Sequence, residues 1–338
     1  MIRDGKVETI YVLSDGEPTL GRYVAPEVIR RELQRLNVYS HVTIHTFALG
    51  RSSEFLEKLA AENNGEYRRV DVPAVTAAVP GAPAHRNDPR RGHFETTFEE
   101  RSPLSVIKQQ VSRDRYNGKH HKPDDYDVTK QGWRVFVPEY YDAQEEYGLL
   151  VWIDPSEQGR IPYPEALTDR KLIGISPNGA GNTQSMWVRA GLALDAAHNM
   201  SKRFMIDSKR IYVAGFSGGG RMSSRLGVMY ADVFSGAFAI DGTDWWEDIP
   251  ADESPGKFFA GRYQKPKGAI LKKARRVNRY LLMTGENDAN RPGTKAAYRH
   301  GFKKAGFKHV KYVEVRGKGH EWPSQAGFLA GLRFLDKG

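Results

Sequence analysis

The sequence around Ser217 could make its hydroxyl a nucleophile. Residues 210–214 are an apolar, β-branched run, residues 215–220 read Gly-Phe-Ser-Gly-Gly-Gly, and residues 221–230 have helical character. A serine hydroxyl is a poor nucleophile at its ordinary pKa, so it needs an exposed position and a nearby base. A sharp strand-to-helix turn, with glycines two before and two after the serine, supplies that exposure. It also frees the backbone N–H of Gly218 to bind an oxyanion, although the same residues could form a turn without chemistry.

Candidates for a base and an acid follow the serine along the chain. His320 stands in a glycine-flanked loop between an expected strand and the last expected helix, and Asp288 and Glu286 both follow another expected strand. An activated serine needs a base, and the base needs an orienting acid. We therefore predict His320 as the base and Asp288 as the acid, with Glu286 as a competing acid. The alternative for His320 is an ordinary surface histidine.

Three loops after expected strands could shape the substrate cleft. An oxyanion needs two backbone donors, and in the loop of residues 154–159 the N–H of Ser156 is the candidate, because the proline before it has none. Trp245 and Trp246, adjacent in a polar loop, could stack on a ring of the substrate or pack as core. Asn182, in a loop rich in glycine and asparagine, could line the cleft or belong to an ordinary turn.

The elements that must position these residues alternate between strand and helix from residue 132 onward. Strands are predicted at 133–137, 149–153, 172–175, 210–214, 236–240, 279–284 and 310–315, and helices near 186–200, 221–230, 294–305 and 323–335. This alternation is typical of a mostly parallel sheet with crossover helices. The near-continuous apolar strands fit a sheet that helices cover on both faces. The predicted fold class is therefore α/β.

The first part of the chain is a separate unit in this prediction. Residues 1–71 indicate strand, helix, strand and helix, with Ser52 or Ser53 as the cap of the second helix. Residues 72–100, rich in proline and alanine near their start, are predicted to be a linker. Residues 101–338 then form the main domain, although its first part, to about residue 127, is polar and hard to assign.

Composition limits the functions that the chain can have. A length of 338 residues with 39% hydrophobic residues fits one large domain or two smaller ones, and the absence of cysteine excludes disulfides and thiolate metal sites. The net charge of +10 is spread along the chain, so we expect no nucleic-acid partner, although the charge favours anionic substrates. No membrane-spanning segment or signal peptide is predicted, which makes a cytoplasmic location the default expectation.

From about residue 130 to its end the chain resembles an α/β-hydrolase. The resemblance depends on residues 149–153, 213–220, 284–288 and 319–320, and it is closest to the esterase group that includes polyhydroxybutyrate-depolymerase-like and feruloyl-esterase-like enzymes. The triad order of that family is serine, acid and histidine. One departure is that the family often has His-Gly-type residues in the first oxyanion loop, where this chain has Asp-Pro.

This resemblance implies a serine esterase without a cofactor or a metal. Ser217 would attack a small-molecule or polymeric ester, His320 would move the proton, and Asp288 would orient His320. Gly218 and Ser156 would hold the oxyanion. Two alternatives remain, a serine peptidase of the same fold and a binding or scaffold protein in which the hydrolase fold is inactive.

The N-terminal residues resemble a different family. Residues 11–19 and 44–50, with 59–60 and 64–68, are similar to the C-terminal half of a von Willebrand factor type A domain. The Asp-x-Ser-x-Ser motif with which such domains often bind a divalent ion is absent, and Asp15 alone cannot build the site, so no metal is expected. Two strands and two helices leave a sheet edge unpaired. The resemblance therefore predicts a partial unit, a remnant of a longer domain or a piece that docks on a protein partner.

Overall fold

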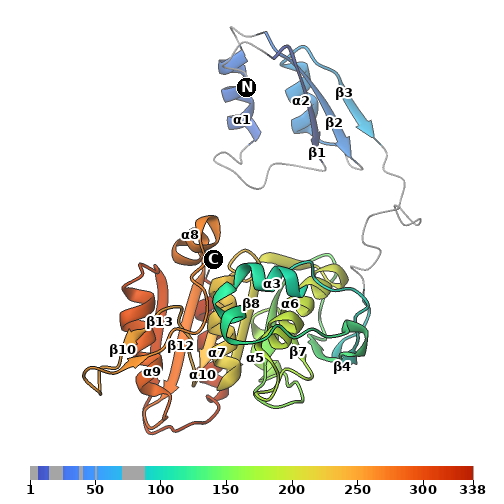
Figure 1. Cartoon of the computed structure of the whole chain (residues 1–338). Helices are drawn as coiled ribbons and strands as arrows, with labels where there is room; N and C mark the ends of the chain where they lie inside the picture. Colours follow the sequence, from blue (N-terminus) through green and yellow to red (C-terminus); the bar gives the residue numbers. More distant parts are fainter. Residues whose placement is uncertain (1–6, 15–25, 38–40, 50–51, 71–87, 338) are drawn as a thin grey trace. The chain divides into compact units, whose positions relative to one another are not determined.

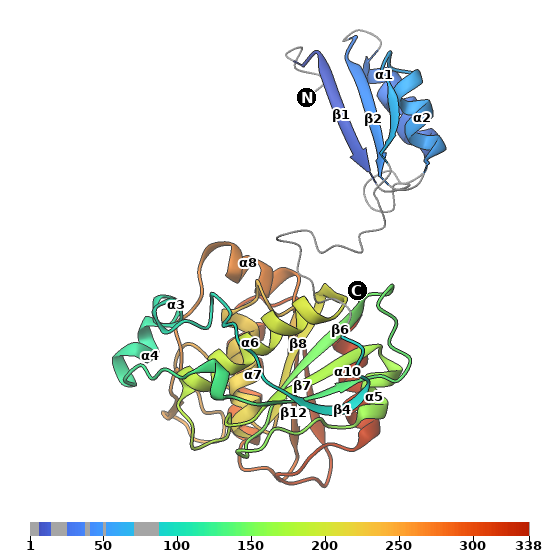
Figure 2. The ribbon, with the colours of Figure 1, turned by 90° about the vertical axis from the view of Figure 1, so that its right-hand side faces the viewer.

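The computed structural model describes residues 7–14, 26–37, 41–49, 52–70 and 88–337 of the chain. These residues belong to two compact units, Met1–Ala84 and His85–Gly338. Figure 1 colours both units along the sequence, and Figure 2 shows them after a rotation of 90°.

The larger unit is built on one eight-stranded sheet with the order β13-β12-β9-β8-β6-β7-β5-β4. Its strands are β4 (Gly92–Thr96), β5 (Trp133–Val137), β6 (Tyr147–Ile153), β7 (Leu172–Pro177), β8 (Ile206–Phe216), β9 (Gly236–Ile240), β12 (Arg279–Gly285) and β13 (His309–Val315). The six strands from β13 to β7 are parallel to one another, and β5 is antiparallel to both β7 and β4. The predicted α/β class with a mostly parallel sheet is confirmed.

Helices cover both faces of this sheet, and each face has its own core. The helices are α3 (Ile107–Arg113), α4 (Arg115–His120), α5 (Pro164–Asp169), α6 (Met186–Arg203), α7 (Gly218–Met229), α8 (Gly268–Arg276), α9 (Arg291–Ala296) and α10 (Gln325–Leu335), with a 3-10 turn at Val128–Lys130 and a π-helix, η3, at Ala297–Lys303. Along β6, Leu149 and Val151 join the core under α6 and α7, while Leu150 and Trp152 join the core under α5 and α10. Because successive side chains of a strand point to opposite faces, a strand buried on both faces has a continuous apolar sequence.

The segment before β5 differs from the prediction. Residues 92–96, predicted to be part of the linker, form the edge strand β4, which pairs with β5 from Gly92 opposite Val137 to Thr96 opposite Trp133. The linker prediction is therefore wrong for these residues, and residues 71–87 lie outside the described part of the chain. A short antiparallel hairpin of β10 (Ile249–Pro250) and β11 (Phe258–Phe259) was also not predicted.

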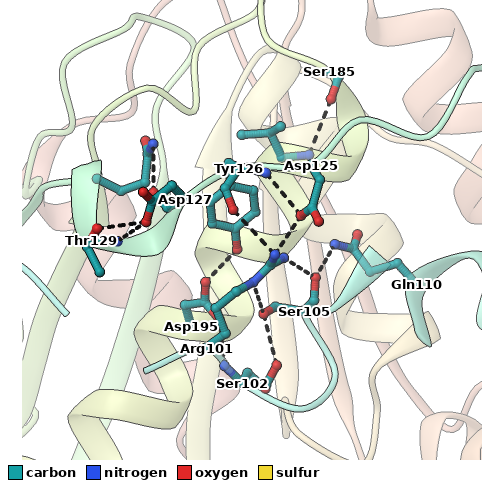
Figure 3. Close-up of polar contacts among 12 residues, drawn as sticks. Arg101, Ser102, Ser105, Gln110, Asp125, Tyr126, Asp127, Thr129, Ser185 and Asp195 are labelled. Carbon is teal, nitrogen blue, oxygen red and sulfur yellow. Dashed lines mark hydrogen bonds and ion pairs between the residues drawn. The ribbon is translucent and has the colours of Figure 1, made fainter. Parts of the chain in front are cut away.

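A partly buried polar network attaches the polar segment after β4 to helix α6 (Figure 3). Asp195, in the middle of α6, accepts a hydrogen bond from the backbone N–H of Ser102 at 2.7 Å and one from the hydroxyl of Tyr126. Arg101 forms an ion pair with Asp125 at 2.5 Å and donates to the carbonyl oxygen of Ser105. Since buried polar groups need partners, the network holds a segment of low apolar content in place.

The smaller unit has a parallel three-stranded sheet in the order β1-β2-β3. Its elements are β1 (Thr9–Ser14), α1 (Pro26–Asn37), β2 (Thr43–Leu49), α2 (Glu54–Ala61) and β3 (Tyr67–Val70). Ser53 caps α2 by accepting a hydrogen bond from the N–H of Leu56. The strand β3 corrects the prediction of two strands only, and Asp15 lies outside the described residues. In the described part of the chain, no helix is long and apolar enough to span a bilayer.

Candidate active site

Ser217 occupies a strained turn between β8 and α7. Strand β8 ends at Phe216 and helix α7 begins at Gly218, and Ser217 between them has φ +56° and ψ −119°. A non-glycine residue in such a region costs on the order of 1–3 kcal/mol and persists only where its surroundings fix it. The backbone N–H of Ser217 donates to the carbonyl oxygen of Ile240 on β9 at 2.8 Å. This bond anchors the turn to the neighbouring strand.

Two of the flanking glycines are required because the backbone passes so closely here. A Cβ atom on Gly215 would lie 2.5 Å from the backbone of Gly219. A Cβ atom on Gly219 would lie 1.9 Å from the carbonyl oxygen of Ile153 at the end of β6. Only glycine allows a backbone to approach another this closely. The glycine spacing read from the sequence therefore reports a real contact between strand and helix.

The structure brings Ser217, His320 and Asp288 together. The hydroxyl of Ser217 and Nε2 of His320 are 2.9 Å apart, and Nδ1 of His320 and Oδ2 of Asp288 are 3.0 Å apart. The three residues come from the β8–α7 turn, the β13–α10 loop and the β12–α9 loop, all at the C-terminal edge of the sheet. The side chain of His320 is 41% exposed and that of Asp288 is fully buried, so the imidazole can reach a substrate while its acid partner is shielded.

The surroundings of Asp288 favour its ionised form. Burial raises the pKa of Asp288, but hydrogen bonds from the backbone N–H of Asn290, from Asp241 and from His320 outweigh this effect, so its pKa lies below the usual value. Glu286, the competing acid of the sequence prediction, is exposed and accepts a hydrogen bond from the backbone N–H of Gly317 at 2.7 Å. Of the two acids, Asp288 is the one hydrogen-bonded to His320.

The two predicted oxyanion donors differ in their partners. Gly218 is the first residue of α7, where a backbone N–H has no partner within the helix. The N–H of Ser156, by contrast, donates to Oδ1 of Asp154 at 2.9 Å, and the hydroxyl of Ser156 donates to the same oxygen at 2.6 Å. The prediction of Ser156 as an oxyanion donor is wrong in this structure. Its N–H already donates to the carboxylate of Asp154, two residues earlier in the chain, as in an Asx turn. Arg160 holds that carboxylate at 2.9 Å.

Asn182, predicted to line the cleft, lies against Gly218, the first residue of α7. A Cβ atom on Gly218 would lie 1.9 Å from Oδ1 of Asn182, so this amide touches the proposed oxyanion donor directly. The backbone N–H of Asn182 donates to the carbonyl oxygen of Pro155 at 2.9 Å, which joins its loop to the loop after β6. The sequence predicted that this loop lies near the cleft, but it gave no sign of the contact between Asn182 and Gly218.

Trp245 and Trp246 are buried, which agrees with the alternative interpretation that they pack in the core. Trp245 and Trp246 stack on one another with ring centroids 3.7 Å apart, and both pack against Phe307. A pocket lies beside α7, and Trp246 is not among the residues that line it. Trp245 does border that pocket, so only one of the two predicted substrate-binding tryptophans borders it.

This pocket measures about 250 Å³ and lies between the loops after β9, β11 and β12. Its polar lining includes Arg221, Asp244, Arg262 and Asn290. Arg221, one helical turn after Ser217, donates to Oδ1 of Asn290 at 2.7 Å, and Asn290 in turn follows Asp288 by two residues. Burial raises the pKa of Asp244, and the nearby arginines 225, 221 and 262 oppose that effect. The pocket is therefore polar, and two guanidinium groups border it.

One group of side chains in the described residues is close enough to hold a metal ion, namely Asp241, Asp288 and His320. Their candidate ligand atoms lie within 4.8 Å of one another. Both ring nitrogens of His320 are already engaged, one with Asp288 and one with Ser217. An ion at this place would have to break one of these hydrogen bonds, so the donor set fits a proton relay better than a metal site.

Comparison with known proteins supports the fold at low sequence identity. No protein-family model matches the chain, and no curated protein does. A mutant of the feruloyl esterase module from Clostridium thermocellum, complexed with sinapinate, matches with a TM-score of 0.50 and 12% identity, covering 77% of this chain and 93% of that one.

Two further solved structures are similar. The ferulic acid esterase from Anaeromyces mucronatus has a TM-score of 0.48 and 15% identity, covering 77% of this chain and 95% of that one. A protein assigned as a dipeptidyl aminopeptidase IV from Bacteroides ovatus has a TM-score of 0.43 and 14% identity, covering 61% of this chain and 33% of that one. The chain has an α/β-hydrolase fold, as the feruloyl esterase module has.

Proposed function

We propose that the chain is a serine hydrolase that cleaves carboxylic esters through an acyl-enzyme. The observation that supports this most is the hydrogen-bonded series from Ser217 through His320 to Asp288, with the hydroxyl on a strained turn at the C-terminal edge of the sheet. The proposed roles are nucleophile for Ser217, general base for His320 and orienting acid for Asp288. A resemblance to the polyhydroxybutyrate-depolymerase-like and feruloyl-esterase-like group supports an ester as the substrate.

The proposed reaction has two halves. In the first, Oγ of Ser217 attacks the ester carbonyl while Nε2 of His320 takes the hydroxyl proton, and the N–H of Gly218 stabilises the oxyanion. Collapse of the tetrahedral intermediate breaks the bond to the alcohol oxygen, which receives the proton from His320. In the second half, His320 takes a proton from water, the resulting hydroxide attacks the acyl-enzyme, and the acid leaves while Ser217 regains its proton.

We further propose that part of the substrate enters the pocket beside α7. Arg221 and Asn290 connect this pocket to Ser217 and Asp288 through short stretches of chain. A guanidinium group binds carboxylate and hydroxyl oxygens well. Esters that carry a carboxylate or a hydroxyl group on the acyl or the alcohol part are therefore the first substrates to test, before purely aliphatic esters.

Covalent labelling with a fluorophosphonate probe tests the proposed nucleophile. We expect the native chain to be labelled, and Ser217→Ala and His320→Ala to lose the label. Ser201→Ala is a matched control, because Ser201 lies on α6 and its hydroxyl donates only to the carbonyl oxygen of Ala197. A folded native chain that takes no label would overturn the enzyme proposal and favour a binding or scaffold role. Hydrolysis of matched amides at rates comparable with esters would favour a peptidase instead.

A further inference from the structure

A second buried carboxyl group lies behind the Asp288–His320 pair. Resting on the proposed function, we propose that Asp241 is a positioning residue for the same reaction. It holds a proton between its own carboxyl group and that of Asp288, and so keeps Asp288 ionised and turned toward His320. Asp241 does not touch Ser217 or the substrate in this proposal.

The backbone fixes Asp241 in this place. Asp241 follows β9 directly, is 2% exposed, and has φ +51°, a left-handed conformation that an L-residue rarely adopts. Its N–H donates to the carbonyl oxygen of Met283 at 2.9 Å, and its Oδ1 accepts from the N–H of Gly285 at 3.0 Å. Both bonds go to β12, the strand that leads into the Asp288 loop. The carboxyl group is thus held beneath that loop, and one oxygen of each acid lies within 4.8 Å of the other and of a ring nitrogen of His320.

Two acids this close and this buried do not ionise together at low cost. Burial is the main cause that raises the pKa of Asp241, to about 7, and the neighbouring Asp288 adds to it. The pKa of Asp288 moves in the opposite direction, below its usual value. The proton of the pair therefore belongs mainly to Asp241, whose O–H donates to the ionised Asp288, and the two groups titrate as a pair.

The other charged groups around Asp241 do not replace that proton. Lys318 and Glu321, from the β13–α10 loop, line a small pocket together with Asp241, but they pair with one another at 3.1 Å. Arg221, from α7, is directed to Asp244 and Asn290. Among the described residues that line this pocket, no unpaired cation is left to neutralise a second negative charge beside Asp288.

The role of Asp241 can be tested by comparing two substitutions across pH. In Asp241→Asn the amide still donates to Asp288 and still accepts from Gly285, but it cannot ionise. We expect its kcat to stay within threefold of the native value at pH 6, and the ratio of its kcat to the native kcat to rise through pH 7 to 9. In Asp241→Ala the donor is gone, and we expect kcat to fall 10- to 100-fold with KM changed less than threefold. Glu286→Gln, which removes a carboxylate from the same edge of the sheet, is the matched control. We expect the ratio of its kcat to the native kcat to stay constant across the same pH range.

Several outcomes would overturn this inference. One is a flat pH ratio for Asp241→Asn, and another is an equal loss in the Asn and Ala variants, which would indicate packing alone. Loss of native activity with a chelator, restored by zinc, would mean that the pair holds a metal ion. If Asp241→Ala does not fold, the pH ratio of the Asn variant decides by itself. Failure of the proposed function looks different, since the native chain would then neither hydrolyse esters nor take a fluorophosphonate.

Discussion

The two sheets of this chain differ in how they are covered. In the eight-stranded sheet, the central strands β6, β9 and β12 are buried on both faces, and two separate cores fill the space under its helices. In the three-stranded sheet, Ile44 and Ala48 are buried, and Thr46 donates to a carbonyl oxygen of α2. On the other face, Tyr11 and Leu13 are 63% and 65% exposed.

This difference shows what a sheet needs in order to hold an active site. A side chain at a strand end is held precisely only when the strand itself cannot move, and dense packing on both faces provides that. Ser217 and Asp288 follow β8 and β12, whose ends are buried, and His320 follows the edge strand β13, which packs against both cores but is only partly buried. The smaller sheet is covered on one face among the described residues, and the candidate site draws no residue from it.

The largest expected effect concerns the two acids that follow β12. We expect Asp288→Asn to lower kcat by about 10³- to 10⁴-fold, because the amide cannot hold the His320 ring in the tautomer that accepts a proton from Ser217. Glu286→Gln should leave kcat within twofold, since its partner is the N–H of Gly317 and not His320. The measurement is steady-state hydrolysis of an activated ester. A larger loss in the Glu286 variant would exchange the roles of the two acids.

The next effect tests the packing of the covered sheet. Leu332 of α10 is 1% exposed in the core under α5 and α10, so Leu332→Ala should cost about 2–5 kcal/mol of unfolding free energy through lost contacts and a cavity. All six tryptophans lie after residue 132, so urea unfolding followed by tryptophan fluorescence reports this unit alone. A cost below about 1 kcal/mol would mean that the second face is less well packed than the structure shows.

A smaller effect, dependent on pH, concerns the end of α10. Burial raises the pKa of Asp336, but ion pairs with Arg210 and Arg170 outweigh it, so its pKa is lower in the folded than in the unfolded chain. Such a group adds stability above the unfolded pKa, about 3.9, and loses it as pH falls through the folded value. Asp336→Asn should therefore lower stability by about 2 kcal/mol at pH 7. The difference should shrink below about pH 4, and a difference independent of pH would exclude the charge as its cause.

Much of this arrangement was predictable because it leaves a local signal. Strands β6, β7, β9 and β12 are buried on both faces and therefore appear as apolar runs. The β8–α7 turn around Ser217 has glycines in its sequence because strand and helix touch there. Asp288 and His320 follow the ends of two expected strands, β12 and β13, which are neighbours in the sheet. The edge strand β4, with alternating half-exposed and exposed residues, gave a much weaker signal.

Other features depend on contacts that a single sequence does not contain. The N–H of Ser156 is engaged because it donates to the carboxylate of Asp154. The sequence allowed the tryptophan pair to belong to the core or to the cleft, and its contact with Phe307, far along the chain, assigns it to the core. The proximity of Asp241 to Asp288 depends on β9 and β12 being adjacent in the sheet, although 38 residues separate the end of β9 from the start of β12. The resemblance of the N-terminal unit to a type A domain, and its protein partner, stay predictions.

The smallest expected effect is on the uncovered sheet. Leu13 lies on the face opposite α1 and α2, so Leu13→Ala should change the stability of the smaller unit by less than about 0.5 kcal/mol. Leu56→Ala, at a fully buried position of α2, is the matched control and should cost about 2–5 kcal/mol. Hydrogen exchange of the β2 amides measures both, since this unit has no tryptophan. If the two substitutions lower the stability of the smaller unit equally, Leu13 is covered in solution. The two sheets would then differ in what covers their faces, and not in how well those faces are packed.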